Sequence, residues 1–102
     1  MIVEYTRYKV AENQGKALVE AYEKAKNVLD TSPYCLSYEL SQCSEEPTSY
    51  ILRIEWDSLN GHLEGFRKSP QFATFFQAVR PFFNDIQEMH HYELTDVNKK
   101  KQ

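Results

Sequence analysis

Residues 50–83 read YILRIEWDSLNGHLEGFRKSPQFATFFQAVRPFF, and this stretch decides the fold. It contains the only Trp and all six Phe of the chain. The first seven residues alternate between two faces, as a strand does. Asp57 and Ser58 then offer capping oxygens to a short helical segment that carries His62 and Phe66. The stretch therefore predicts a strand that leads directly into a helix.

A second helix is predicted to begin after Ser69-Pro70. Its apolar residues follow the spacing i, i+3, i+4, i+7, which places them on one helical face. They are Phe72, Phe75, Phe76 and Val79. A strand followed by two aromatic-faced helices can form one wall of a core or one wall of a ligand pocket, and the spacing alone leaves both interpretations open.

The N-terminal third predicts a strand and a longer helix. Residues 2–10 are rich in β-branched and aromatic types, which favour a strand. One face of this strand carries Ile2, Glu4, Thr6, Tyr8 and Val10. A turn over 11–15 follows, with Asn13 as the expected N-cap of a helix over 14–29. Ser32 precedes a proline, which favours an extended backbone and ends the helix.

Two further strands are predicted over 34–43 and 49–56, joined by a link short enough for an antiparallel hairpin. In the first of them Tyr34, Leu36, Tyr38 and Leu40 are expected on one face, with Cys35, Ser37, Glu39 and Ser41 on the other. In the second, Arg53 and Glu55 share the face opposite Leu52, Ile54 and Trp56. We expect Arg7 and Glu39 to join that pair in an ion-pair network.

Residues 85–94 complete the pattern as a last strand, giving the order β-α-β-β-α(α)-β. This order predicts an α+β, ferredoxin-like fold, with helices on one face of a four-stranded antiparallel sheet. Residues 1–94 would form one domain, and 95–102, which include three consecutive Lys, a flexible basic tail. Because apolar side chains occur on both faces of several strands, we expect a homodimer to cover the open face of the sheet.

The composition excludes several classes of protein. The chain has 102 residues, is 41% hydrophobic and carries a formal net charge of −3, so a nucleic-acid partner is not expected. It shows neither an apolar run of membrane-spanning length nor a signal peptide. Cys35 and Cys43 lie too far apart on one strand for a disulfide, which predicts free thiols and a reducing, cytoplasmic location.

The central stretch resembles the antibiotic biosynthesis monooxygenase family. The matching pieces are Ile54-Glu55-Trp56-Asp57-Ser58, the segment 62–66, Ser69-Pro70-Gln71-Phe72 and Val79-Arg80-Pro81-Phe82. The resemblance implies a dimeric α+β barrel. It also implies one of the family's activities: cofactor-free oxidation of quinol-like or polycyclic phenols, haem degradation, or isomerisation of a signal molecule.

The resemblance also identifies which family positions have changed. In the haem-degrading branch an Asn, a Trp and a haem-ligating His stand where this chain has Thr6, Phe66 and Phe76. In the quinol-oxidising branch a His often stands at the position of Phe66, whereas here His62 lies one turn earlier on the same helical face. The haem-degrading set is thus absent, and His62 is the candidate catalytic histidine.

The candidate catalytic residues are His62, as a general base, and Arg80, as the partner of an anionic substrate. Arg80 precedes a proline, so we expect an extended backbone that ends the helix there. Expected substrate-binding residues are Thr6, Tyr8, Trp56, Phe66, Phe72 and Phe76. For each of these the alternative is ordinary packing or, for Arg80, a simple ion pair.

The sequence predicts no metal and no cofactor. His90 and His91 are adjacent on a strand and point to opposite faces, so they cannot bind one ion together, and a metal site would need partners such as Glu88 or Glu93. We expect a cofactor-independent monooxygenase acting on a small aromatic or quinol-like substrate. The alternatives are a non-catalytic, stress-associated module that binds a small apolar ligand and, less favoured, a haem-binding protein.

Overall fold

The computed structural model describes residues 1–101 and forms one sheet with a helical layer on one side. The elements in chain order are β1 (Ile2–Lys9), α1 (Gly15–Thr31), β2 (Cys35–Gln42), β3 (Ser49–Trp56), a π-helical segment (Gly61–Phe66), α2 (Phe72–Val79), a 3-10 helix (Arg80–Asp85) and β4 (Ile86–Glu93). Residues 95–101 form neither helix nor strand, and Gln102 of the predicted tail lies outside the described residues.

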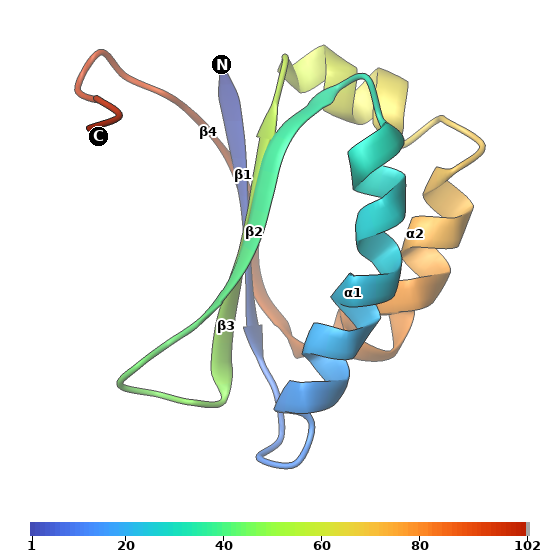
Figure 1. Ribbon diagram of the computed structural model, residues 1–102, viewed down its shortest axis with the longest axis vertical. Coiled ribbons are helices and arrows are strands. Elements are labelled where there is room, and N and C mark those ends of the chain that lie inside the picture. The colour runs from blue at the N-terminus through green and yellow to red at the C-terminus, as the bar shows by residue number, and fades with distance from the viewer. Residues whose placement is uncertain (102) are drawn as a thin grey trace.

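The sheet has the strand order β2-β3-β1-β4, and every neighbouring pair is antiparallel. Both α1 and α2 pack against the same face, which Figure 1 shows with the sheet edge-on and the helices on the right. No helix within residues 1–101 covers the opposite face. The predicted ferredoxin-like topology is therefore confirmed.

Most element boundaries match the sequence patterns, but two local expectations are wrong. The N-cap of α1 is Gln14 rather than Asn13, and it makes no side-chain capping bond. Arg80 has helical angles, φ −52° and ψ −40°, and begins the 3-10 helix instead of ending a helix in an extended conformation. A proline at the next position is tolerated because it stands in the first turn of that new helix.

A β-bulge in β2 changes which of its side chains face the core. The register with β3 shifts between Cys35 and Ser37. As a result Cys35 packs against the core, whereas Leu36 is 52% exposed. The expected alternation therefore fails at these two residues, because the bulge inserts one unpaired residue into the strand.

The core lies between the helices and the inner face of the sheet. Its largest fully buried side chains are Trp56, Leu18, Leu29 and Ile54. In α1 the buried residues Leu18, Tyr22, Ala25 and Leu29 recur at intervals of three and four, which forms one continuous apolar face. The stripe on α2 behaves differently: all four of its residues are only half-buried.

The outer face of the sheet carries an ion-pair network that is only partly as expected. Arg53 pairs with Glu55 at 2.9 Å and with Glu39 at 4.0 Å, whereas Arg7 pairs with Glu88 of β4 at 3.6 Å. In the sheet Arg7 lies between Ile51 of β3 and Glu88 of β4, so its acidic neighbour is on β4.

Within residues 1–101, no helix is long and apolar enough to span a membrane.

Candidate active site

A cavity of about 260 Å³ lies between α2 and the inner face of the sheet, and we call it the aromatic cavity. Every predicted site residue except Arg80 lines it: Thr6, Tyr8, Trp56, His62, Phe66, Phe72 and Phe76. The half-buried stripe of α2 forms part of its wall. The aromatic residues of α2 are thus exposed to a hollow rather than packed into a continuous core.

The inner face of β1 supplies the floor of the aromatic cavity. Because side chains alternate along a strand, Glu4, Thr6 and Tyr8 project to the same side. Their exposed fractions are only 5%, 2% and 2%. Glu4 is therefore a carboxylate enclosed by protein, in a position where an acidic side chain is uncommon unless it has a partner.

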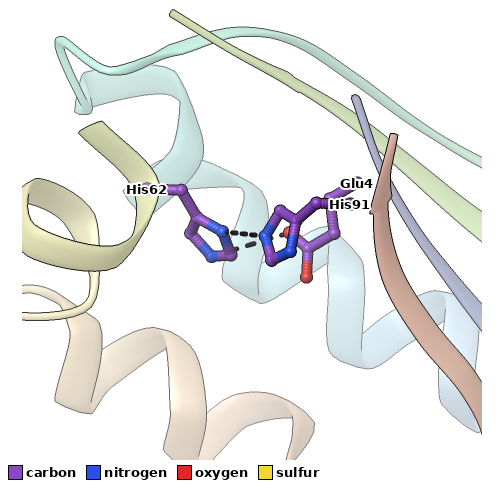
Figure 2. A group of neighbouring side chains, drawn as sticks. All are labelled: Glu4, His62 and His91. Carbon is purple, nitrogen blue, oxygen red and sulfur yellow. Dashed lines mark hydrogen bonds and ion pairs between the residues drawn. The ribbon is translucent and has the colours of Figure 1, made fainter. Parts of the chain in front are cut away.

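Glu4 has such partners at one end of the cavity. Its Oε1 accepts a hydrogen bond from the indole Nε1 of Trp56 at 3.0 Å and lies 3.6 Å from Nε2 of His62. The His62 ring stacks on Trp56 with a centroid distance of 4.2 Å and an interplanar angle of 8°. The Nδ1 of His62 lies 2.6 Å from Nε2 of His91 on β4 (Figure 2). Four separate elements, β1, β3, the π-helical segment and β4, thus converge on one polar cluster.

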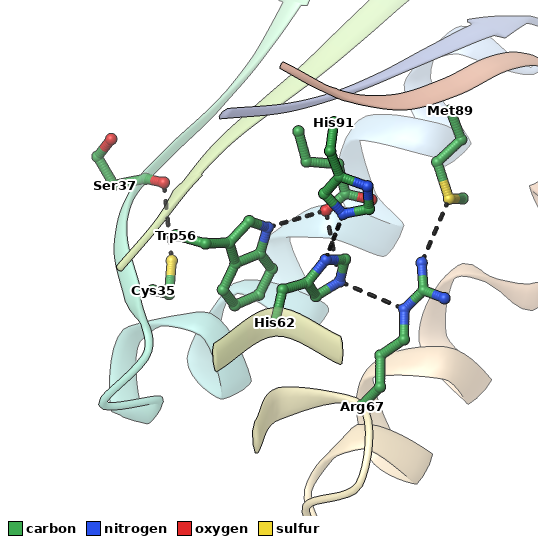
Figure 3. A network of polar contacts seen from close by, with 8 residues as sticks. Cys35, Ser37, Trp56, His62, Arg67, Met89 and His91 are labelled. Carbon is green, nitrogen blue, oxygen red and sulfur yellow. Dashed lines mark hydrogen bonds and ion pairs between the residues drawn. The ribbon is translucent and has the colours of Figure 1, made fainter. Parts of the chain in front are cut away.

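Arg67 completes this cluster at the rim of the cavity. Its Nε donates to Nε2 of His62 at 3.3 Å, and its guanidinium also contacts the Met89 sulfur at 3.6 Å (Figure 3). Because Nε2 accepts this bond, the His62 proton resides on Nδ1 and is donated to His91. Both ring nitrogens of His62 are therefore engaged.

Burial shifts the pKa values of His62 and Glu4 in opposite directions. Removal from water, helped by the nearby Arg67 and His91, lowers the pKa of His62 to about 3. Burial raises the pKa of Glu4, with the Trp56 hydrogen bond and Arg67 opposing that rise. A histidine with so low a pKa is a weak base. The carboxylate of Glu4, made more basic by its surroundings, is the stronger candidate for accepting a proton.

A pair of phenols lines another part of the cavity. The hydroxyl groups of Tyr8 and Tyr22 are 2.5 Å apart, and burial raises the pKa of both. Both therefore stay neutral; one hydroxyl donates to the other, which leaves one O–H group for a ligand oxygen. The remaining wall is apolar: Phe66 contacts the rings of Trp56, Phe72 and Phe75 at centroid distances of 4.9 to 5.6 Å.

Arg80 does not line the aromatic cavity; it is exposed at the start of the 3-10 helix. Arg67 is the arginine next to the cluster. Sequence reasoning also missed Glu4 and His91 as site residues. The signal for Glu4 was present, since it is the one acidic residue on a strand face otherwise occupied by Ile2, Thr6, Tyr8 and Val10.

Three side chains of this cluster have the donor atoms and the spacing of a metal site. Glu4, His62 and His91 each offer one ligand atom, and these atoms all lie within 4.8 Å of one another. His90 points to the other face and bonds Glu88 at 2.9 Å, so the two adjacent histidines are separated by the sheet as expected. The acidic partner nearest His62 is Glu4, rather than Glu88 or Glu93.

The two cysteines are free, as predicted. Cys35 donates its thiol hydrogen to the carbonyl of Ser37 at 3.7 Å (Figure 3). Burial raises its pKa to about 11, so the group remains a protonated thiol at neutral pH. It therefore adds no nucleophile to the site.

Comparison with known proteins gives consistent results. The sequence model of the family described as antibiotic biosynthesis monooxygenase matches residues 1–78. The uncharacterised protein YczJ of Bacillus subtilis is 25% identical over 93 residues, which cover 91% of this chain and 98% of that protein.

Solved structures show the same fold. A protein assigned to the antibiotic biosynthesis monooxygenases from Bordetella bronchiseptica has a TM-score of 0.80 at 21% identity, with 92% of this chain and 96% of that chain covered. SnoaB, a cofactor-independent oxygenase from Streptomyces nogalater, has a TM-score of 0.72 at 13% identity, with 99% and 97% covered. At such identities the likeness concerns the fold alone.

Proposed function

The chain belongs to the antibiotic biosynthesis monooxygenase family, and from that premise we propose that it is a cofactor-independent monooxygenase of a small aromatic, quinol-like substrate. The observation that supports the proposal most strongly is the buried carboxylate of Glu4 beside an aromatic cavity. A flat, electron-rich ring fits a hollow walled by Phe and Trp side chains. The cavity volume of about 260 Å³ favours a substrate at the small end of the usual range.

The first step is removal of a proton from a substrate hydroxyl group. Glu4 accepts that proton, and its raised pKa makes its carboxylate a stronger base than that of an exposed glutamate. The resulting anion lies beside largely apolar walls, where charges interact more strongly than in bulk water. Arg67, at the rim beside His62, supplies the positive charge that stabilises the anion.

The electron-rich anion then reacts with dioxygen, which is the oxidant. A quinol gains one oxygen atom on its ring and becomes a hydroxyquinone, while the second oxygen atom leaves as water. The substrate supplies all four electrons and Glu4 returns its proton to the departing water, so the reaction balances without a bound redox group. One of the Tyr8 and Tyr22 hydroxyls donates to the other, and the O–H group that remains free can donate to the second substrate oxygen.

Oxygen uptake by chelator-treated protein tests this function. A panel of quinols and simple phenols should reveal at least one substrate that consumes one dioxygen per molecule. Mass spectrometry with isotopically labelled dioxygen should then find one labelled atom in the product. A protein that binds members of the panel yet consumes no oxygen with any of them would overturn the proposal.

A non-catalytic binding module is the second candidate, favoured by the loss of the family's Asn, Trp and His at Thr6, Phe66 and Phe76. It predicts a ligand that raises the melting temperature and is recovered unchanged. Haem binding has less support from the site. A haem needs room for its wide porphyrin ring beside the ligating nitrogen, whereas Nδ1 of His62 faces His91 at 2.6 Å and Nε2 faces Arg67 at 3.3 Å.

A further inference from the structure

We propose that Glu4, His62 and His91 form a binding site for a divalent transition-metal ion such as Zn²⁺, and that an ion bound there blocks the base. Metal binding itself is independent of the proposed oxygenase function; only its inhibitory consequence rests on that function. The cluster combines two imidazoles and one carboxylate from β1, the π-helical segment and β4. This donor set suits first-row divalent metals.

The distances within the cluster are close to those a metal site requires. Bonds of about 2.1 Å from a metal to its ligands imply ligand–ligand separations of about 3.0 to 3.4 Å. The His62 Nδ1 and His91 Nε2 atoms are 2.6 Å apart, so they would have to separate by less than about 1 Å. The Glu4 carboxylate is already in the same group of atoms within 4.8 Å. An ion would therefore replace the hydrogen that these nitrogens now share.

The surroundings already hold two of the three ligands in place. The Nε1–H group of Trp56 fixes the Glu4 carboxylate at 3.0 Å, and stacking on the same indole fixes the plane of the His62 ring. Outer partners of this kind orient metal ligands and raise affinity. Figure 2 shows the His62 and His91 rings with their nitrogens directed at one another. A site with restrained ligands loses little entropy when an ion binds.

Arg67 opposes metal binding in the present arrangement. With a metal on Nδ1, the His62 hydrogen would move to Nε2, where the Arg67 N–H now donates at 3.3 Å. The relocated hydrogen has an acceptor nearby, since Glu4 Oε1 lies 3.6 Å from Nε2. Arg67 is exposed, so its guanidinium can turn toward water. We therefore expect reversible binding rather than a permanently occupied site, and tighter binding when Arg67 is neutralised.

Titration of untagged wild-type protein with Zn²⁺, in competition with a chromophoric chelator, tests the site directly. We expect one ion per chain. The variants Glu4→Gln and His91→Ala should each weaken affinity at least tenfold. His90→Ala is the matched control, because it removes the adjacent imidazole from the other face of β4 and should leave affinity unchanged. Cu²⁺ should also quench the fluorescence of Trp56, the only tryptophan of the chain.

Arg67→Gln keeps the proposal testable if Glu4→Gln or His91→Ala fails to fold, since it removes an exposed side chain and should tighten Zn²⁺ binding. The proposal is overturned if no ion binds, if His90→Ala weakens binding as much as His91→Ala does, or if Arg67→Gln leaves affinity unchanged. Oxygen uptake provides the separate readout. Zn²⁺ should inhibit and a chelator should restore turnover, whereas binding of Zn²⁺ to a protein that never turns over would refute only the oxygenase function.

Discussion

Glu4 is the residue on which the proposed chemistry depends, and it was not among the candidates from sequence. A carboxylate within a strand normally marks a solvent-facing position. Here it faces inward, and its exposed fraction of 5% follows from helices packed over that face. Its hydrogen bond comes from Trp56, 52 positions away in the chain, and its burial comes from other distant segments. Spacing within one strand cannot reveal such partners.

The arginine beside the cluster gives a prediction at the same scale. Arg67→Gln should raise the KM for an acidic phenol roughly tenfold, because it removes one charge-assisted contact to the substrate anion. Arg80→Gln is the matched control, since Arg80 is an exposed arginine that does not line the cavity. Steady-state oxygen uptake measures both variants. An equal change in KM for the two variants would refute the role of Arg67 as the partner of the substrate anion.

His62 should make the protein less stable in acid. Its folded pKa of about 3 lies below the ordinary 6.5, so the unfolded chain binds the extra proton first as the pH falls. The stability it contributes is complete above pH 6.5 and is lost as the pH falls toward 3. The pKa of His91 is also lowered, with the same sign, whereas the raised pKa of Glu4 acts in the opposite direction.

His62→Phe keeps the stacked ring and removes this titration. Between pH 7 and pH 5, the variant should lose less unfolding free energy than wild type, with a difference on the order of 1 kcal/mol after allowance for solvent screening. Urea unfolding at the two pH values measures it. If the unfolding free energy of wild type and variant fell equally between the two pH values, burial would not be holding His62 neutral.

At the scale of elements, the π-helical segment Gly61–Phe66 positions the site. It places both His62 and Phe66 toward the sheet, and Ser58 Oγ accepts from the Gly61 N–H at 2.8 Å to fix its start. A helix that carries His62 and Phe66 could be predicted from the sequence, because the capping oxygens of Asp57 and Ser58 precede it. The sequence could not predict three local features, because each depends on packing against distant segments. They are the π-helical winding of this segment, the bulge in β2 and the helical backbone of Arg80.

Gly65 tests how tightly this segment is held. A Cβ at that position would lie 2.5 Å from two ring carbons of Tyr34, so Gly65→Ala should destabilise the protein by about 1 to 3 kcal/mol. Combining it with Tyr34→Ala should cost less than the sum of the two single changes, because the clash disappears. Tyr34→Phe keeps the ring and should give no such relief. Additive costs in urea unfolding would contradict the contact.

For the molecule as a whole, we propose that the outer face of the sheet mediates homodimerisation. This face is not covered by a helix within residues 1–101 (Figure 1), and it exposes Ile51 at 37% and Tyr92 at 46%. Tyr5 and Tyr92 contact each other there edge to face at 5.4 Å. Exposed apolar groups beside the ion pairs of Arg53 are typical of an interface between subunits.

Ile51→Glu should therefore convert a dimer into a monomer, because a second copy would have to bury the added charge. Val19→Glu is the control, since Val19 is a similarly exposed apolar residue on α1, on the helical side of the molecule. Light scattering coupled to size exclusion measures the mass of each protein. A wild-type monomer at every concentration would contradict the proposed interface.

We propose that Glu4 acts as the base of a cofactor-independent oxygenation in the aromatic cavity. The most direct test compares wild type with Glu4→Gln in chelator-treated buffer, with substrate binding followed by Trp56 fluorescence and turnover by oxygen uptake. We expect Glu4→Gln to bind substrate within a few-fold of wild type and its turnover to fall by about 10² to 10⁴. Glu4→Gln turning over at the wild-type rate would contradict it.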